Sequence, residues 1–308
     1  ISKAKDAKNQ YAEAQTNEEK QLNEVADWIS TKVGETTGGG SSDYNPADDG
    51  VPIPSGFVYV GGTKASGLVI SDATADKEKY KGQTTVGTDL VGNQFVWIPV
   101  ENIADYKRTA YAGGSLSDYS ENLPEDEKTS VESNKGYYIG RYEAGDQEST
   151  NSKALRTSSS STSNAITVKA GQAPYNYVTK TQAESLAKGF SGQQGYTSVK
   201  SKLISSYAWD TAIAFIQKTN SDYGSSSEEG NYYDSPTFTY TGIADTEKNK
   251  QTKKNGTSTL IPTGQTTAVN NIYDMGGNVW EWTTESCSYT YSPYTRRGGT
   301  YNLSLIHI

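Results

Sequence analysis

The chain has few of the side chains on which enzyme catalysis usually depends. Its 308 residues include one cysteine, Cys287, and one histidine, His307. Without a second histidine, the Ser/His/Asp and Cys/His triads, zinc hydrolase sites and the facial iron triad lack their usual parts. Cys287 has no accompanying base and cannot form an internal disulfide. The sequence therefore predicts no catalytic residue and no copper or iron site.

A tyrosine-rich segment at 284–302 (TESCSYTYSPYTRRGGTYN) has the composition of a recognition surface. Rigid aromatic rings beside small Ser and Thr side chains combine contact area with adaptable hydrogen bonding. A tyrosine-rich loop without a particular role is the alternative interpretation. We predict that the following residues contact a ligand: Tyr289, Tyr291, Tyr294, Arg296 and Tyr301.

The overall composition limits the classes of partner. The formal net charge is −8, whereas nucleic acids and anionic membrane surfaces bind clusters of Lys and Arg. No stretch has the length of apolar residues that crosses a bilayer. The hydrophobic share is only 33%, which favours loop-rich structure over a helical bundle. Nucleic acid is therefore not an expected partner.

The two ends of the sequence differ in character from its middle. Apolar residues recur every three or four positions through 1–33, which predicts an amphipathic helix. Residues 34–50 are rich in Gly, Ser and Asp and indicate a flexible linker. Residues 303–308 (LSLIHI) match a translated frame of a transposon-end sequencing adapter, so we interpret them as an artefact, an apolar strand being the alternative.

Between the ends, β-type runs come first and helices follow. Short runs bounded by Gly, Asn or Pro occur at 57–60, 68–70, 95–100 and 137–139. Thr179 and Gln182 form a capping box, and Ser205 or Ser206 can cap a second helix. The sequence therefore predicts an α+β domain with small antiparallel sheets, two helices and long loops.

The most specific pattern is the segment 271–283 (NIYDMGGNVWEWT). Trp280 and Trp282 alternate with Glu281, so in a strand both indoles face one way and the carboxylate faces the other. Two indoles on one side would bury a large apolar area. We therefore predict that Trp280 and Trp282, together with Trp209 of the second helix, are core residues rather than ligand contacts.

With RGGTY at 297–301, this segment resembles the signature of the formylglycine-generating-enzyme (sulfatase-modifying-factor) family, whose fold is shared with C-type lectins. Weaker similarities occur at 56–62, 137–143 and 203–210. The resemblance implies a C-type-lectin-like domain over 51–302. Residues 1–33 resemble the polar half of the N-terminal helix of type IV pilin-like proteins, in which a membrane-inserted half comes first.

The resemblance also implies a metal site. In enzymes of this family, calcium is held by the segment that corresponds to 271–283. Carried over position by position, the ligands are the Asp274 and Glu281 carboxylates and the Gly277 and Val279 carbonyls. Calcium takes about six to eight oxygens, so further ligands would complete the site. Alternatively, Asp274 caps the turn and Glu281 pairs with an arginine such as Arg297.

Together these features favour a non-catalytic protein displayed on a bacterial cell surface, a pilin-like or pilus-associated adhesin or receptor. It would bind an extracellular protein or glycan and contact pilin-like subunits through residues 1–33. Diversity-generating retroelements favour Tyr, Ser, Thr and Asn in the corresponding region of proteins with this fold. A receptor diversified in this way is therefore one form that the binding protein could take. One alternative is a formylglycine-generating cysteine oxidase whose catalytic C-terminal segment, beyond residue 302, is missing here; Cys287 does not match the family's cysteine pair. A purely structural pilus subunit is the other.

Overall fold

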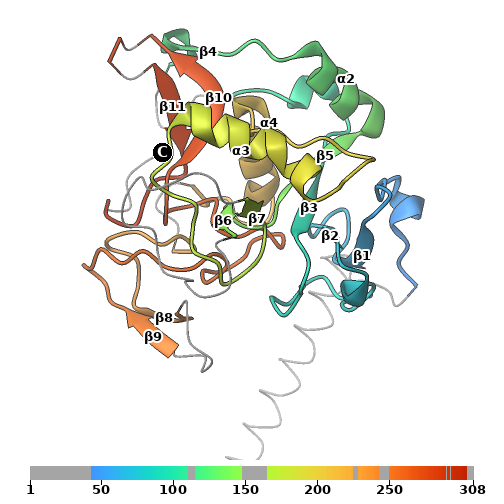
Figure 1. Ribbon diagram of the computed structural model, residues 1–308, viewed down its shortest axis with the longest axis horizontal. Coiled ribbons are helices and arrows are strands. Elements are labelled where there is room, and N and C mark those ends of the chain that lie inside the picture. Colours follow the sequence, from blue (N-terminus) through green and yellow to red (C-terminus); the bar gives the residue numbers. More distant parts are fainter. Residues whose placement is uncertain are drawn as a thin grey trace, which may run out of the picture.

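The computed structural model describes residues 43–109, 115–147, 165–224, 228–242 and 250–303, apart from positions 289 and 292. The predicted helix at 1–33, Tyr289 and residues 304–308 lie outside these ranges. Within them the chain forms a mixed α/β structure with three α-helices and small antiparallel sheets (Figure 1). None of these helices is both long and apolar enough to span a membrane.

The strands form four separate sheets. The largest has the order β1–β2–β3–β5, the second has the order β11–β10–β4, and β6–β7 and β8–β9 form two-stranded pairs. The strands are β1 Val58–Gly61, β2 Val69–Ser71, β3 Gln94–Pro99, β4 Tyr119–Ser120, β5 Gly136–Gly140, β6 Gly145–Asp146, β7 Ile166–Thr167, β8 Phe238–Thr241, β9 Lys250–Lys253, β10 Glu281–Cys287 and β11 Tyr294–Arg297. The helices are α2 Glu125–Asn134, α3 Lys180–Gln193 and α4 Ser206–Gln217. Short 3₁₀ turns occupy Pro46–Asp49, Thr74–Asp76, Ile103–Asp105 and Leu116–Asp118.

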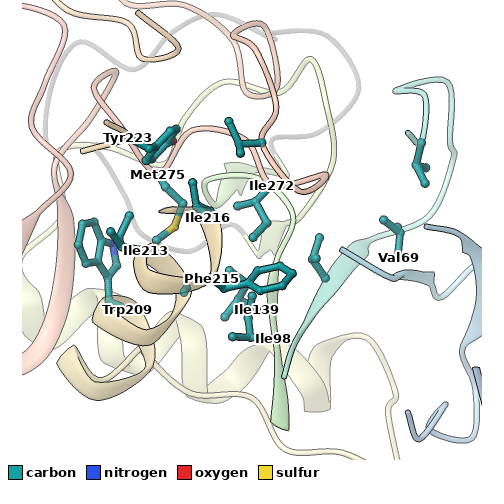
Figure 2. Packing of buried hydrophobic residues seen from close by; sticks show 14 of the residues in the cluster. Val69, Ile98, Ile139, Trp209, Ile213, Phe215, Ile216, Tyr223, Ile272 and Met275 are labelled. Atoms are coloured by element: carbon teal, nitrogen blue, oxygen red, sulfur yellow. The ribbon is translucent and has the colours of Figure 1, made fainter. Parts of the chain in front are cut away.

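The main core lies between α4 and the four-stranded sheet (Figure 2). α4 begins after Ser205, whose side chain accepts a hydrogen bond from the Ala208 N–H, so the predicted cap is confirmed. Its buried face consists of Trp209, Ala212, Ile213, Phe215 and Ile216. These side chains pack against Val69, Ile98, Ile139, Ile272 and Met275, which come from three strands and from the loop before β10.

The four strands of the larger sheet lie close to the four predicted runs. Their side chains alternate between two packing surfaces, as the period of a strand requires. Val96 and Ile98 of β3 belong to the core beneath α4, whereas Trp97 packs in a second cluster with Leu68 and Ile70 on the other side. The sheet is therefore covered on both faces.

The helix α3 begins at the predicted capping box, in which Thr179 and Gln182 bond each other's backbone N–H. The sequence does not predict α2. Val131 is its one buried apolar residue, so the apolar periodicity that marks the other two helices is absent from it. Its buried Glu127 instead accepts hydrogen bonds from Tyr106 and Ser205. Polar contacts therefore hold this helix against the domain.

The packed domain extends from at least residue 43, before the predicted boundary at 51. Asn45 caps the turn at Pro46–Asp49 by accepting from the Ala47 N–H at 3.3 Å. Tyr44 packs at the edge of the second cluster, and its hydroxyl accepts a hydrogen bond from the Lys64 N–H at 3.1 Å. Residues 43–50 of the predicted linker are thus held by specific contacts.

Candidate functional site

The segments on which the family resemblance depends meet around 271–283. The Gly277 N–H donates to the Gly298 carbonyl at 2.6 Å, which joins this segment to RGGTY. The Asn278 amide donates to the Glu143 carboxylate at 2.8 Å, which joins it to the strand segment 137–143. The arrangement places residues that are far apart in the sequence around a single turn.

Asn278 is the centre of this turn. Its side chain is fully buried, and its amide nitrogen also donates to the Ile261 carbonyl at 3.1 Å. Its amide oxygen accepts from the Asn231 amide at 2.9 Å and from the Ile261 N–H at 3.1 Å. The Val279 N–H bonds the other oxygen of Glu143 at 3.0 Å. One side chain thereby connects three loops.

Three carboxylates face the interior beside this turn. Asp274 and Glu143 are buried, and Glu281 of β10 is half-buried with its carboxylate accepting from the Trp209 indole N–H at 2.6 Å. Burial raises the pKa of Asp274 to about 7 and that of Glu281 to about 7. Burial, with the charges of the other two, raises the pKa of Glu143 well above its usual range. Ionising this group of side chains is therefore costly unless a cation neutralises them.

Among the described residues, no ion pair involves Glu143, Asp274 or Glu281. No hydrogen bond from a described backbone N–H ends on the carbonyl of Gly277 or Val279. The described residues contain no group of three or more His, Cys, Asp or Glu side chains arranged to hold a metal ion. Carboxylate and main-chain oxygens are ligands that calcium accepts.

The contacts of the two carboxylates differ from those in the alternative interpretation. Asp274 accepts from the Gly264 N–H at 2.7 Å, in a separate loop, and from no described backbone N–H of the glycine turn that follows it. Glu281 pairs with Trp209, and Arg297 bonds other acids. The Arg297 guanidinium lies 3.0 Å from Glu285 and 3.3 Å from Asp210.

This arginine belongs to a buried ionic network behind β10. Glu285 is 1% exposed and also pairs with Arg108 at 2.9 Å. Asp210 of α4 is 0% exposed and accepts from the Thr109 N–H at 2.8 Å. The network joins β10 and β11 to α4 and to the segment near residue 108. It therefore fixes the position of the β10–β11 pair.

The outer side of the same strands carries the two indoles. As predicted, Trp280 and Trp282 lie on one side of the strand and Glu281 lies on the other. The sequence predicts that the indoles face the interior, but in the structure Glu281 faces the interior and the indoles lie on the outer side. The Arg296 guanidinium stacks 3.8 Å from the Trp280 ring centroid and 5.3 Å from that of Trp282. The prediction that Trp280 is a core residue is wrong, since its side chain is 40% exposed. The buried ionic network occupies the inner side of β10, so the indoles lie outside.

Trp209 and Trp282 have different environments. Trp209 is 1% exposed and lies in the main core. Trp282 is half-buried, and its indole N–H donates to the Val178 carbonyl just before α3, at 2.9 Å. This bond sets β10 against the N-terminal end of α3, beside which β10 and β11 lie (Figure 1). Trp282 is therefore fixed to the segment before α3, whereas Trp280 is exposed.

Two of the predicted ligand residues, Tyr294 and Arg296, lie on this surface. Tyr294 is 43% exposed and faces the Lys180 ammonium at 5.4 Å. Tyr291, in the turn between β10 and β11, is 98% exposed. Tyr301 lies apart from them in the turn after β11, where its N–H donates to the Asn278 carbonyl. The aromatic face, as we name it, consists of Trp280, Trp282, Tyr294 and Arg296.

Comparisons with known proteins gave no relative: no family model, curated protein or solved structure matched the chain. The geometry of the site therefore supports its interpretation without help from homologues.

Sequence reasoning missed several residues that position the aromatic face. Arg108 and Asp210 lie far from β10 in the sequence, and no local pattern connects them to it. Glu143 was noted only as part of a strand. One signal was present in β10 itself: Glu281, Thr283 and Glu285 recur at every second position, as residues on one side of a strand do.

Proposed function

We propose that this protein binds a ligand through the aromatic face and catalyses no reaction. Two large aromatic side chains on this face are exposed, Trp280 and Tyr294, and the exposed Tyr291 lies in the turn of the same strand pair. Arg296 lies among them, and the buried ionic network holds the strands behind them. Aromatic residues and arginine supply most of the binding energy at protein recognition surfaces, and rigid support lowers the entropic cost of binding.

The proposed protein is a C-type-lectin-like domain of the formylglycine-generating-enzyme type, displayed outside a bacterial cell. The convergence of the resembling segments around Asn278 supports the fold, and the aromatic face supports binding. The helix expected at 1–33 would connect the domain to pilin-like subunits. The ligand would then be an extracellular glycan or protein. The single observation that carries the proposal is the gathering of exposed aromatic rings and an arginine on one supported strand pair.

Removing the two exposed rings beside Arg296 is expected to weaken binding strongly and to leave the fold intact. Trp280→Ala combined with Tyr294→Ala should weaken ligand binding by a factor of about 100, because recognition surfaces depend on a few aromatic residues. The full chain, labelled, would be applied to an array of glycans and peptides, and the affinity for each hit measured by calorimetry.

The matched control for this double variant is Tyr233→Ala. Tyr233 is 40% exposed, like Trp280, but lies outside the aromatic face, so its loss should leave each affinity unchanged. If the double variant binds every hit as tightly as the wild type does, the aromatic face is not the binding surface and the proposal fails.

We further propose that a calcium ion is bound at the turn between Asp274 and Glu281. The two carboxylates and the Gly277 and Val279 carbonyls would hold it, and the ion would supply the positive charge that the described surroundings lack. Its role would be structural, because it would fix the turn that leads into β10. Loss of the ion would leave Asp274, Glu281 and Glu143 facing one another without a cation.

Calcium is expected to stabilise the protein more at pH 8 than at pH 5. The pKa values near 7 of Asp274 and Glu281 lie above their unfolded values, so their favourable contribution without metal is present at low pH and is lost as the pH rises through 7. Calcium binds the ionised forms. The melting temperature should therefore rise by about 5 °C with saturating calcium at pH 8, and by much less at pH 5.

The control for this measurement is Asp274→Asn combined with Glu281→Gln, which keeps the shapes and removes both charges. It should lose the calcium-dependent rise in melting temperature, whereas Glu132→Gln on the exposed surface of α2 should keep it. An unchanged calcium response in the double variant would place the ion elsewhere.

A further inference from the structure

Arg296 is held in a defined orientation on the aromatic face. It lies directly opposite Trp282 in the β10–β11 pair, and its guanidinium carbon lies over the Trp280 ring, 3.8 Å from the ring centroid. A guanidinium over an aromatic ring is attracted by the negative face of that ring. Stacking uses the flat surface of the group and leaves the N–H groups around its edge available. Arg296 thus has a prepared set of donors.

These donors have no acceptor among the described residues. Neither a hydrogen bond from the Arg296 side chain nor an ion pair with it occurs in that part of the chain, and the side chain is exposed. The neighbouring Arg297 points inward and is paired with Glu285 and Asp210. Lys180, the other cation beside this face, is half-buried and pairs with Glu184 at 2.5 Å. Arg296 is therefore the cation of this face that lacks a described acidic partner.

The sequence around Arg296 also excludes acids. From 286 to 302 there is no Asp or Glu, although the whole chain has 36 of them and a net charge of −8. The positive charge of Arg296 attracts an anion, and no acidic side chain within this segment repels that anion. Charge complementarity therefore assigns a negative group to the ligand.

We propose that the aromatic face binds a saccharide that carries a carboxylate, with Arg296 holding the carboxylate and the rings of Trp280 and Tyr294 packing against the sugar. This rests on the proposed binding function and names its ligand class. The guanidinium edge matches a carboxylate in a planar, two-bond geometry, which an ammonium group does not offer.

A saccharide fits this face better than an acidic peptide does. Sugar rings have flat C–H surfaces that pack on exposed aromatic rings, whereas peptide anchors need pockets in which side chains are fully desolvated. A cavity of about 410 Å³ lies elsewhere and is lined by residues that include Tyr44 and Lys81. The aromatic face itself consists of exposed rings on a strand pair, which suits a ligand lying flat.

The test uses the full chain and a panel of acidic saccharides, oligogalacturonate and sialyl-lactose, each paired with its methyl ester. The ester keeps the sugar and removes the charge. The wild type should bind at least one acid about tenfold more tightly than its ester, and the difference should shrink as salt is added. Arg296→Gln should bind acid and ester equally weakly, and Arg296→Lys should recover only part of the difference. Lys200→Gln, an exposed charge beyond the far end of α3, should change nothing.

Other outcomes overturn the inference in distinguishable ways. Equal binding of acid and ester that Trp280→Ala abolishes would retain the binding function and reject the carboxylate. Binding of a poly-glutamate peptide, but of no acidic saccharide, through Arg296 would make the ligand a peptide. If the wild type binds no acidic member of the panel, the saccharide assignment is wrong, while the array experiment on the aromatic face still decides the binding function.

Discussion

Asn278→Ala is expected to lower the free energy of unfolding by about 3 kcal/mol or more. The substitution removes an amide that makes four buried hydrogen bonds, to Glu143, Asn231 and both polar backbone groups of Ile261. Each partner then stays buried without its bond, and no water replaces the amide in the same geometry. Alanine must also adopt the left-handed backbone of Asn278, with φ 56°.

Urea denaturation would measure this loss, with two variants to separate its causes. Asn278→Gly tolerates the left-handed backbone but lacks the amide, so it should recover only about 1 kcal/mol relative to alanine. Asn255→Ala is the matched control, because that amide also bonds a carbonyl, of Asp234 at 2.6 Å, but does so in an exposed position. A loss in Asn278→Ala no larger than that in Asn255→Ala would show that the turn does not depend on this side chain.

Arg297→Met is expected to cost about 3 to 5 kcal/mol of stability, because it leaves two buried carboxylates with less positive charge. Asp210 and Glu285 are 0% and 1% exposed, and Arg108 would remain as a cation beside Glu285 alone. Burial already raises the pKa of Asp210 to about 6, and Arg297 opposes that rise. The pKa of Asp210 should therefore increase further in the variant.

The pH dependence identifies the cause of this second loss. An acid whose folded pKa is raised stabilises the fold at low pH and loses that contribution as the pH increases. The difference between Arg297→Met and wild type should thus be larger at pH 8 than at pH 5. Lys79→Met breaks the exposed pair with Asp89 and should cost at most about 1 kcal/mol at either pH. A small, pH-independent effect of Arg297→Met would mean that the buried network contributes little.

The local signals in the sequence predict much of the fold. The capping residues Thr179 and Ser205 stand before helices with apolar periodicity, so both α3 and α4 follow from local chemistry. The short apolar runs at 68–70 and 95–100 become adjacent strands because each is bounded by turn residues. α2 lacks an apolar face, and the contacts of Glu127 that position it come from distant parts of the chain. No local pattern could have predicted it.

For the candidate site, the alternation in β10 predicts which side chains share a side, but not which side is inside. Large apolar residues are usually the ones buried, so the sequence predicts that Trp280 and Trp282 belong to the core. Here Glu285 is neutralised by Arg297 and Arg108, which makes its burial tolerable. Two arginines therefore determine which side of β10 is buried, and one of them, Arg108, lies about 180 residues before Glu285 in the sequence.

The pairing of β10 with β4 has a consequence for the order of folding. Ser286 and Cys287 pair with Ser120 and Tyr119, so this sheet joins segments separated by more than half of the chain. Closing so long a loop is entropically costly, and contacts of this kind form late. The strand pair cannot complete its sheet during synthesis until Arg297 has left the ribosome. The rings on the outer side of β10 and β11 therefore take their final positions only after the chain has been synthesised through residue 297, so a shortened chain would lack the whole binding surface.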